Sequence, residues 1–88
     1  MYEEKVLLQN EIGLHSRPAS LFIREAVKHP CDITVVKDNR SYNAKSIMSI
    51  LSMSANKGEE IIIRAQGDGE ETAVKALVDL VENRLRDL

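Results

Sequence analysis

The sequence predicts an α+β fold, in which a four-stranded antiparallel sheet is covered on one face by two long helices and one short helix. Two segments repeat apolar residues at helical spacing, four short runs alternate apolar and polar residues, and the elements follow the order βαββαβα. Each long helix needs a partner for its apolar stripe, and the inner face of one sheet supplies it. We therefore expect an open-faced sandwich of two layers, with the outer face of the sheet in water.

The chain of 88 residues is long enough for one modest hydrophobic core and too short for a second. We therefore expect a single domain over residues 1–88, with any chemistry on its surface. Aromatic residues are scarce, so the core is expected to be aliphatic.

The first strand and first helix are separated by a turn-rich segment at residues 10–13. Val6 and Leu8 alternate with their neighbours in the strand. From Ser16 the apolar spacing becomes helical, and Pro30 ends the helix. The expected buried stripe of this helix is Ala19, Phe22, Ile23, Ala26 and Val27.

Residues 32–43 predict a β-hairpin, with strands at 32–37 and 40–43 joined by Asp38 and Asn39. Ser46 then suits the N-cap of a short helix. This helix, expected to be a single turn, ends before the Asn56-Lys57-Gly58 segment.

The last two elements are a strand over residues 60–65 and a long amphipathic helix. Asp68 and Glu71 have the spacing of a capping box at the start of this helix. Arg84 and Arg86 lie near its end, where the helix dipole favours cations.

Composition restricts the function classes. The chain has 12 basic and 14 acidic residues, a net charge of −2, which does not indicate nucleic-acid binding. It shows neither a signal peptide pattern nor an apolar run of about 20 residues that could span a membrane, so we expect a cytoplasmic monomer whose partners are proteins. Cys31 is the only cysteine, and His15, His29 and Cys31 do not form a known metal-binding spacing, so no metal or cofactor is expected.

The segment Gly13-Leu14-His15-Ser16-Arg17-Pro18-Ala19 carries the strongest functional signal. Pro18 suits a first helical turn, which places His15 at a helix N-terminus. Free backbone N–H groups and the positive end of the dipole attract phosphate there, and Arg17 adds a guanidinium. An imidazole is substantially neutral near pH 7 and can attack phosphorus. We interpret His15 as a phosphoryl acceptor and Arg17 as a group that stabilises the phosphate.

This segment, together with Lys45-Ser46-Ile47-Met48 and the order of the elements, resembles the HPr family, the histidine-containing phosphocarrier proteins of the bacterial sugar phosphotransferase system. The resemblance covers nearly the whole chain. It implies that enzyme I, charged from phosphoenolpyruvate, phosphorylates His15 on Nδ1 and that the phosphoryl group passes to enzyme IIA domains. Sequence chemistry alone does not choose the nitrogen.

The resemblance also implies a regulatory role for Ser46. In firmicute-type members an HPr kinase/phosphorylase modifies this serine, and the modified protein is a corepressor for a catabolite control protein. By itself Ser46 is an N-cap, and the two roles are compatible because a helix N-terminus tolerates a phosphate.

We expect partner proteins to dock beside His15. A short helix cannot bury Ile47, Met48 and Leu51 together, and flexible Met suits a surface with several partners. The predicted partner-binding residues are Ser16, Ser20, Arg24, Ile47, Met48 and Leu51. Family members commonly have Gly where this chain has Ser49, and often a basic residue where this chain has Val27. The valine weakens the positive rim that is expected to meet an acidic enzyme I.

Two other functions compete with the carrier hypothesis. A small phosphatase with His15 as nucleophile lacks an evident general acid near the motif. A purely regulatory paralogue would act through phosphorylated Ser46 alone, but such paralogues characteristically lose the histidine that this chain retains. His29, before Pro30, is interpreted as a surface residue at a helix end.

Overall fold

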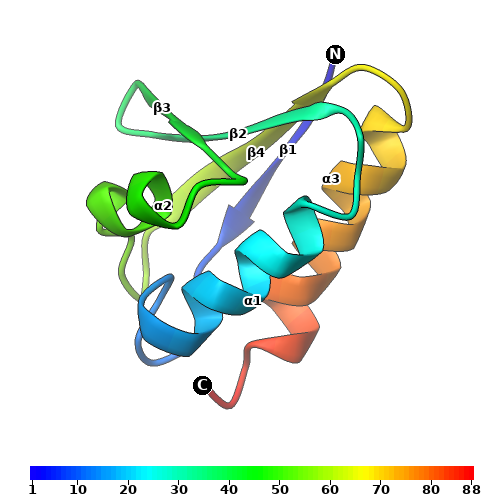
Figure 1. The fold of residues 1–88 in the computed structure, drawn as a ribbon. Helices are drawn as coiled ribbons and strands as arrows, with labels where there is room; N and C mark the ends of the chain where they lie inside the picture. Colours follow the sequence, from blue (N-terminus) through cyan, green and yellow to red (C-terminus); the bar gives the residue numbers. More distant parts are fainter.

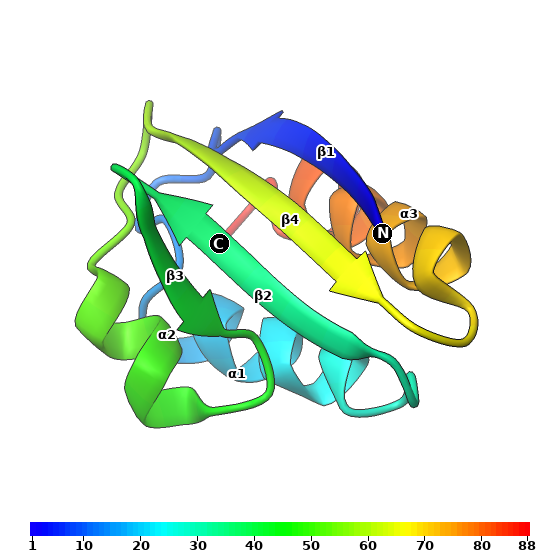
Figure 2. The same cartoon turned by 90° about the horizontal axis from the view of Figure 1, so that it is seen from above.

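The computed structural model describes all residues 1–88, and a four-stranded sheet forms one of its two layers (Figure 1). The elements are β1 (Tyr2–Leu7), α1 (Ser16–Ala26), β2 (Asp32–Lys37), β3 (Arg40–Asn43), α2 (Ile47–Met53), β4 (Glu60–Gln66), α3 (Glu70–Asp79) and the π-helix η1 (Leu80–Arg84). The strand order is β1-β4-β2-β3, and every neighbouring pair is antiparallel. The helices lie on one side of the sheet (Figure 2), which confirms the predicted fold class.

The strands alternate buried and more exposed residues, as expected of a sheet that is covered on one face only. In the central strand β4, Ile61, Ile63 and Ala65 are buried, whereas Ile62 and Arg64 are only half-buried. Val6 pairs with Ile61 and Ile33 with Ala65, so neighbouring strands present their buried residues to the same core. The core is one cluster of 22 buried residues, aliphatic apart from Phe22 and Cys31.

The hairpin prediction is confirmed. Asp38 and Asn39 connect β2 and β3 with φ of 52° and 66°. Two central residues with positive φ match the right-handed twist of the flanking strands, and Asp and Asn tolerate this conformation better than most residues.

Helix α2 is longer than expected. It has 7 residues, nearly two turns rather than one. Its C-cap residue is Ser54, which adopts the left-handed conformation with φ of 55°. The expectation that it could not bury all its apolar residues nevertheless holds, since Ile50 and Met53 are buried and Met48 is exposed.

The capping box predicted for the last helix is wrong. Gly69 is the N-cap of α3 and has no side chain with which to cap. The Oε1 atom of Glu70 instead accepts a hydrogen bond from the backbone N–H of Gly67 at 3.0 Å. The final turn widens into η1, where the N–H of Leu85 bonds to the carbonyl of Leu80. Arg84 lies in this last turn as predicted.

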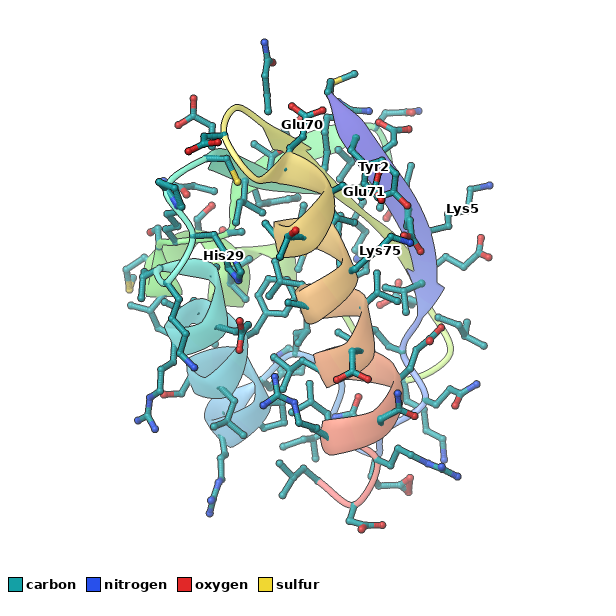
Figure 3. All side chains as sticks on the ribbon, turned by 90° about the vertical axis from the view of Figure 1, so that its right-hand side faces the viewer. Tyr2, Lys5, His29, Glu70, Glu71 and Lys75 are labelled. Atoms are coloured by element: carbon teal, nitrogen blue, oxygen red, sulfur yellow. The ribbon has the colours of Figure 1, made fainter.

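Side chains of β1 and α3 contact one another where the strand lies beside the helix (Figure 3). The Tyr2 hydroxyl donates to Glu4 at 2.6 Å, and Lys75 Nζ lies 5.7 Å from the centre of the Tyr2 ring. The hydrogen bond to Glu4 raises the pKa of Tyr2.

None of the helices combines the length and apolar character that crossing a membrane requires.

Candidate functional site

His15 is the N-cap residue of α1, as the sequence predicts. Its backbone is extended, with φ −122° and ψ 161°, and its side chain does not cap the helix. The N–H groups of Ser16 and Arg17 therefore have no intrahelical partner. Pro18 occupies the third helical position, where its missing N–H costs nothing. The first turn has no acidic residue, so its partial positive charge is not neutralised from within the helix.

Ser16 adopts a left-handed conformation, with φ of 50°. This conformation costs an L-residue about 1–2 kcal/mol. The sequence contained no sign of it, because Ser is not typical of the left-handed region. The strain lies directly between His15 and Arg17.

The imidazole of His15 contacts a residue that sequence reasoning missed. Its Nε2 lies 2.8 Å from Oδ1 of Asn56, and Nδ2 of Asn56 donates to the carbonyl of Ser54 at 3.1 Å. His15 and Asn56 are 41 positions apart. No local pattern could have indicated this contact, because Asn in a loop is ordinary turn chemistry.

Gly13 brings the two segments together. The N–H of Leu14 donates to the carbonyl of Ala55 at 3.0 Å. Gly13 has a φ of 62°, and a Cβ atom there would lie 2.3 Å from the Ala55 oxygen. Only glycine fits this close approach, so it positions the histidine loop against the segment that carries Asn56.

Arg17 is exposed and makes no hydrogen bond or ion pair with the rest of the protein. Its guanidinium is therefore available to an incoming anion. Ser16, Ser20 and Arg24 are also exposed on α1, which is the placement expected of partner-binding residues.

Ser46 is the N-cap of α2, as predicted. Its Oγ accepts a hydrogen bond from the N–H of Ser49 at 3.3 Å. The neighbouring Lys45 is occupied, because its Nζ donates to the carbonyl of His29 at 2.7 Å. Ser49 does not disrupt the helix; its hydroxyl accepts from the N–H of Asn43 at 2.8 Å and joins the end of β3 to α2.

The predicted apolar docking residues are exposed. Solvent reaches 42% of Ile47, 73% of Met48 and 39% of Leu51. Helices α1 and α2 are in contact, and both ribbon views show α2 beside the N-terminal half of α1 (Figures 1 and 2). Val27, which the sequence placed on the buried stripe of the first helix, is instead exposed at the C-cap of α1, so that part of the expectation is wrong.

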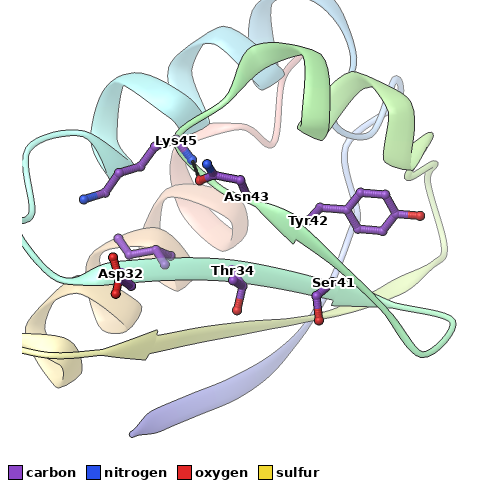
Figure 4. Close-up of a pocket in the computed structure, with 7 residues that line it drawn as sticks. Asp32, Thr34, Ser41, Tyr42, Asn43 and Lys45 are labelled. Carbon is purple, nitrogen blue, oxygen red and sulfur yellow. Dashed lines mark hydrogen bonds between the residues drawn. The ribbon is translucent and has the colours of Figure 1, made fainter.

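A shallow cavity of about 390 Å³ lies at the β2–β3 edge (Figure 4). Asp32, Thr34, Ser41, Tyr42, Asn43 and Lys45 are among the residues that line it. None of these is a predicted site residue. The candidate site is thus an exposed surface around a helix start and lies outside this cavity.

The comparison with known families decides where this arrangement belongs. Residues 2–83 match the family described as PTS-HPr, PTS HPr component phosphorylation site. The chain belongs to the HPr family. HPr proteins are phosphocarriers of the phosphotransferase system and are not catalysts themselves.

Relatives of two kinds resemble the chain. HPr-like protein Crh of Bacillus subtilis is 36% identical over 97% of this chain and 100% of its own length. The phosphocarrier protein HPr of Vibrio cholerae is 39% identical over 93% of this chain and 96% of its own length. The family signal therefore includes both an HPr-like protein and a phosphocarrier.

Solved structures agree on the fold. HPr-C-His from Thermoanaerobacter tengcongensis is 45% identical, with a TM-score of 0.96 over 100% of this chain and 99% of that chain. The HPr dimer from the same organism is 47% identical, with a TM-score of 0.77 over 97% of this chain and 98% of that chain. Both match nearly the full length of the HPr-family fold.

Proposed function

We propose that this HPr-family protein carries a phosphoryl group on His15, taking it from phosphorylated enzyme I and passing it to enzyme IIA domains. The start of α1 carries this proposal: it combines the imidazole, two free N–H groups and an unpartnered guanidinium, and it has no acidic side chain to compete with an anion.

In the proposed reaction a lone pair on the His15 ring attacks phosphorus. The bond from phosphorus to the donor's histidine nitrogen breaks, and its electron pair stays on that nitrogen. Arg17 and the N–H groups of Ser16 and Arg17 hold the phosphoryl oxygens during the transfer. The reverse sequence delivers the group to enzyme IIA.

The experiment that tests this proposal is incubation with phosphoenolpyruvate and enzyme I, followed by intact-mass measurement. One acid-labile phosphoryl group is expected on the parent protein. His15→Ala should fold normally and take none. His29→Ala is the matched control, because it removes the other histidine and should still be phosphorylated. Phosphorylation of His15→Ala at the parent rate would overturn the proposal.

A second function, regulation through Ser46, is favoured by the similarity to Crh and by the N-cap position of this serine. We propose that HPr kinase/phosphorylase modifies Ser46 and that the product binds a catabolite control protein. ATP and the kinase should give an acid-stable phosphate on the parent and none on Ser46→Ala. The two sites are compatible in one chain.

We also propose that the carrier acts in the cytoplasm as a monomer, although its relatives include an HPr dimer. The helix start and the exposed residues of α2 belong to one chain, so the site needs no second copy. Sedimentation equilibrium should give the mass of one chain, 9.9 kDa. A mass of two chains at assay concentration would make the monomer prediction wrong.

A further inference from the structure

The contact between His15 and Asn56 supports an inference that deepens the proposed function and rests on it. We propose that Asn56 is a positioning residue for phosphoryl transfer: it holds the imidazole proton on Nε2 and so leaves Nδ1 as the nitrogen that accepts phosphorus.

The orientation of the Asn56 amide establishes which atom faces the ring. Its Nδ2 donates to the carbonyl of Ser54 at 3.1 Å, so Oδ1 is the atom 2.8 Å from Nε2 of His15. An amide oxygen only accepts hydrogen bonds, so Nε2 must be the donor. A neutral imidazole has one N–H group, and its lone pair is then on Nδ1.

Asn56 is itself held in place. Its backbone N–H donates to Oε1 of Glu59 at 2.7 Å. The other oxygen of Glu59 lies 3.4 Å from Nζ of Lys37, whose side chain is only 13% exposed. Lys37 also donates to the carbonyl of Met53 at 3.3 Å, at the end of α2. Lys37 on β2 and Glu59 on the loop between α2 and β4 thus fix the segment that carries the amide.

The same hydrogen bond accommodates the charge that develops on the ring. As the lone pair of Nδ1 forms the bond to phosphorus, the donor's bond to phosphorus breaks and its electron pair leaves with the donor. The Nε2 proton remains on the ring, which gains positive charge. A hydrogen bond from a charged donor is stronger than one from a neutral donor, so the contact with Asn56 strengthens during transfer.

Nitrogen-15 NMR of the unphosphorylated protein tests the inference directly, because the two ring nitrogens report which of them carries the proton. In the parent at a pH where the ring is neutral, the Nε2–H form should dominate. Asn56→Leu keeps a similar size without an acceptor and should lower the ratio of the two forms about fivefold, the factor for one net hydrogen bond of about 1 kcal/mol. The matched control is Lys57→Ala, in the same loop, which should leave the ratio unchanged.

Asn56→Asp shows whether the acceptor or the local packing is responsible. It keeps an oxygen for Nε2, so the neutral ring should retain the Nε2–H form. Its carboxylate should also extend the imidazolium form to higher pH, because an adjacent negative charge favours the charged ring. A proton mainly on Nδ1 in the parent, or an unchanged ratio in Asn56→Leu, would overturn the inference.

Transfer kinetics separate this inference from the proposed function. Asn56→Leu should accept phosphate from enzyme I about fivefold more slowly through kcat, with KM little changed, because the loss of one net hydrogen bond affects the reacting ring. If the parent takes no phosphate while its tautomer behaves as expected, the carrier function fails and the placement of the proton stands. If the parent is phosphorylated but on Nε2, the role of Asn56 is wrong and the carrier function stands.

Discussion

The two ends of α1 differ in whether their charged side chains have partners within the protein. At the C-terminal end, Glu25 lies 2.9 Å from His29 and 3.2 Å from Arg84, and Lys45 donates to the carbonyl of His29. At the N-terminal end no side chain caps the helix and Arg17 has no partner. The charged side chains at the C-terminal end are thus paired within the protein, while the partial positive charge at the N-terminal end has no negative partner in the chain.

The two histidines of the chain follow the same division. His29 is bonded to a carboxylate and its side chain is 16% exposed, so it is half-buried rather than the simple surface residue that the sequence indicated. His15 is bonded to a neutral amide and borders free N–H groups. The partner of the ring therefore distinguishes a histidine that helps to hold the fold from one that is available for chemistry.

The largest effect is expected when the start of α1 is made acidic. Arg17→Glu removes a charge-assisted hydrogen bond to phosphate and adds a like charge, a combined loss of about 3 kcal/mol, or about 100-fold in the rate of phosphorylation by enzyme I. The melting temperature should not fall, because an acidic residue in a first turn is favourable. Lys5→Glu, with the same charge change on β1, is the control. Comparable rates for Arg17→Glu and Lys5→Glu would mean that Arg17 is an ordinary surface charge.

The exposed residues of α2, beside the N-terminal half of α1, should be the next most sensitive to substitution. Met48→Asp adds a charge that docking must desolvate, so the KM for enzyme I should rise about tenfold, the equivalent of about 1.4 kcal/mol. Because 73% of Met48 is exposed, the melting temperature should change little. Steady-state kinetics and thermal unfolding decide between the possibilities. A large loss of stability would show that Met48 belongs to the core.

Substitutions at the C-terminal end of α1 should change the stability of the protein and leave the rate of phosphoryl transfer unchanged. Glu25→Gln removes the carboxylate shared by Lys28, His29 and Arg84 and should cost about 1 kcal/mol, which is roughly 4–8 °C in melting temperature for a domain of this size. The rate of phosphorylation by enzyme I should be unchanged. A slower rate in a folded variant would contradict the separation of the two ends.

The effect of Glu25 should also depend on pH. The hydrogen bond from His29, followed by that from Arg84, lowers the pKa of Glu25 from its ordinary 4.5. A carboxylate whose pKa is lowered in the folded state stabilises the protein at any pH above its ordinary pKa. This contribution is lost as the pH falls through the folded-state pKa. The melting difference between parent and Glu25→Gln should therefore be full near pH 7 and close in acid. A difference that persists unchanged in acid would exclude this carboxylate as its source.

The smallest effect is expected at the start of α2, which Ser46 caps with a neutral hydroxyl. Ser46→Asp should slow phosphorylation of His15 about threefold, because a negative charge opposes the acidic surface expected of enzyme I. The helix should be no less stable, since an anion at its start is favourable. Part of the loss should be recovered at high salt, where screening shortens the reach of the repulsion. Equal rates across an ionic-strength series would leave Ser46 only its capping role on this pathway.

Local patterns predicted most of the fold and the core of the site. The hairpin followed from Asp38 and Asn39, and the position of His15 followed from Pro18, because in each case neighbouring residues determine the backbone. The capping box failed because Gly69 is the N-cap, so Asp68 does not occupy the capping position. The widened turn at η1 also lacked a local signal.

The partners of His15 could not be predicted, for a different reason. The sequence contains Asn56, Glu59 and Lys37, but the contacts between them depend on how the loop after α2 lies against β2 and the segment before α1. Side-chain spacing along one element carries no information on such contacts. The place of His15 at a helix start was predictable, whereas its hydrogen-bond partner and the contacts that hold that partner required the folded chain.

The close approach of Gly13 to Ala55 has a consequence for mutational scanning of this protein. Any side chain at position 13 would displace the loop that holds Asn56, since the added atom would lie 2.3 Å from the Ala55 oxygen. If the proposed function holds, a scan scored by phosphorylation would therefore rank Gly13 with His15 itself, although the atoms of Gly13 need not touch donor or phosphate. A parallel scan scored by protein abundance would separate the two positions, because replacing Gly13 should lower abundance and replacing exposed atoms of His15 should not.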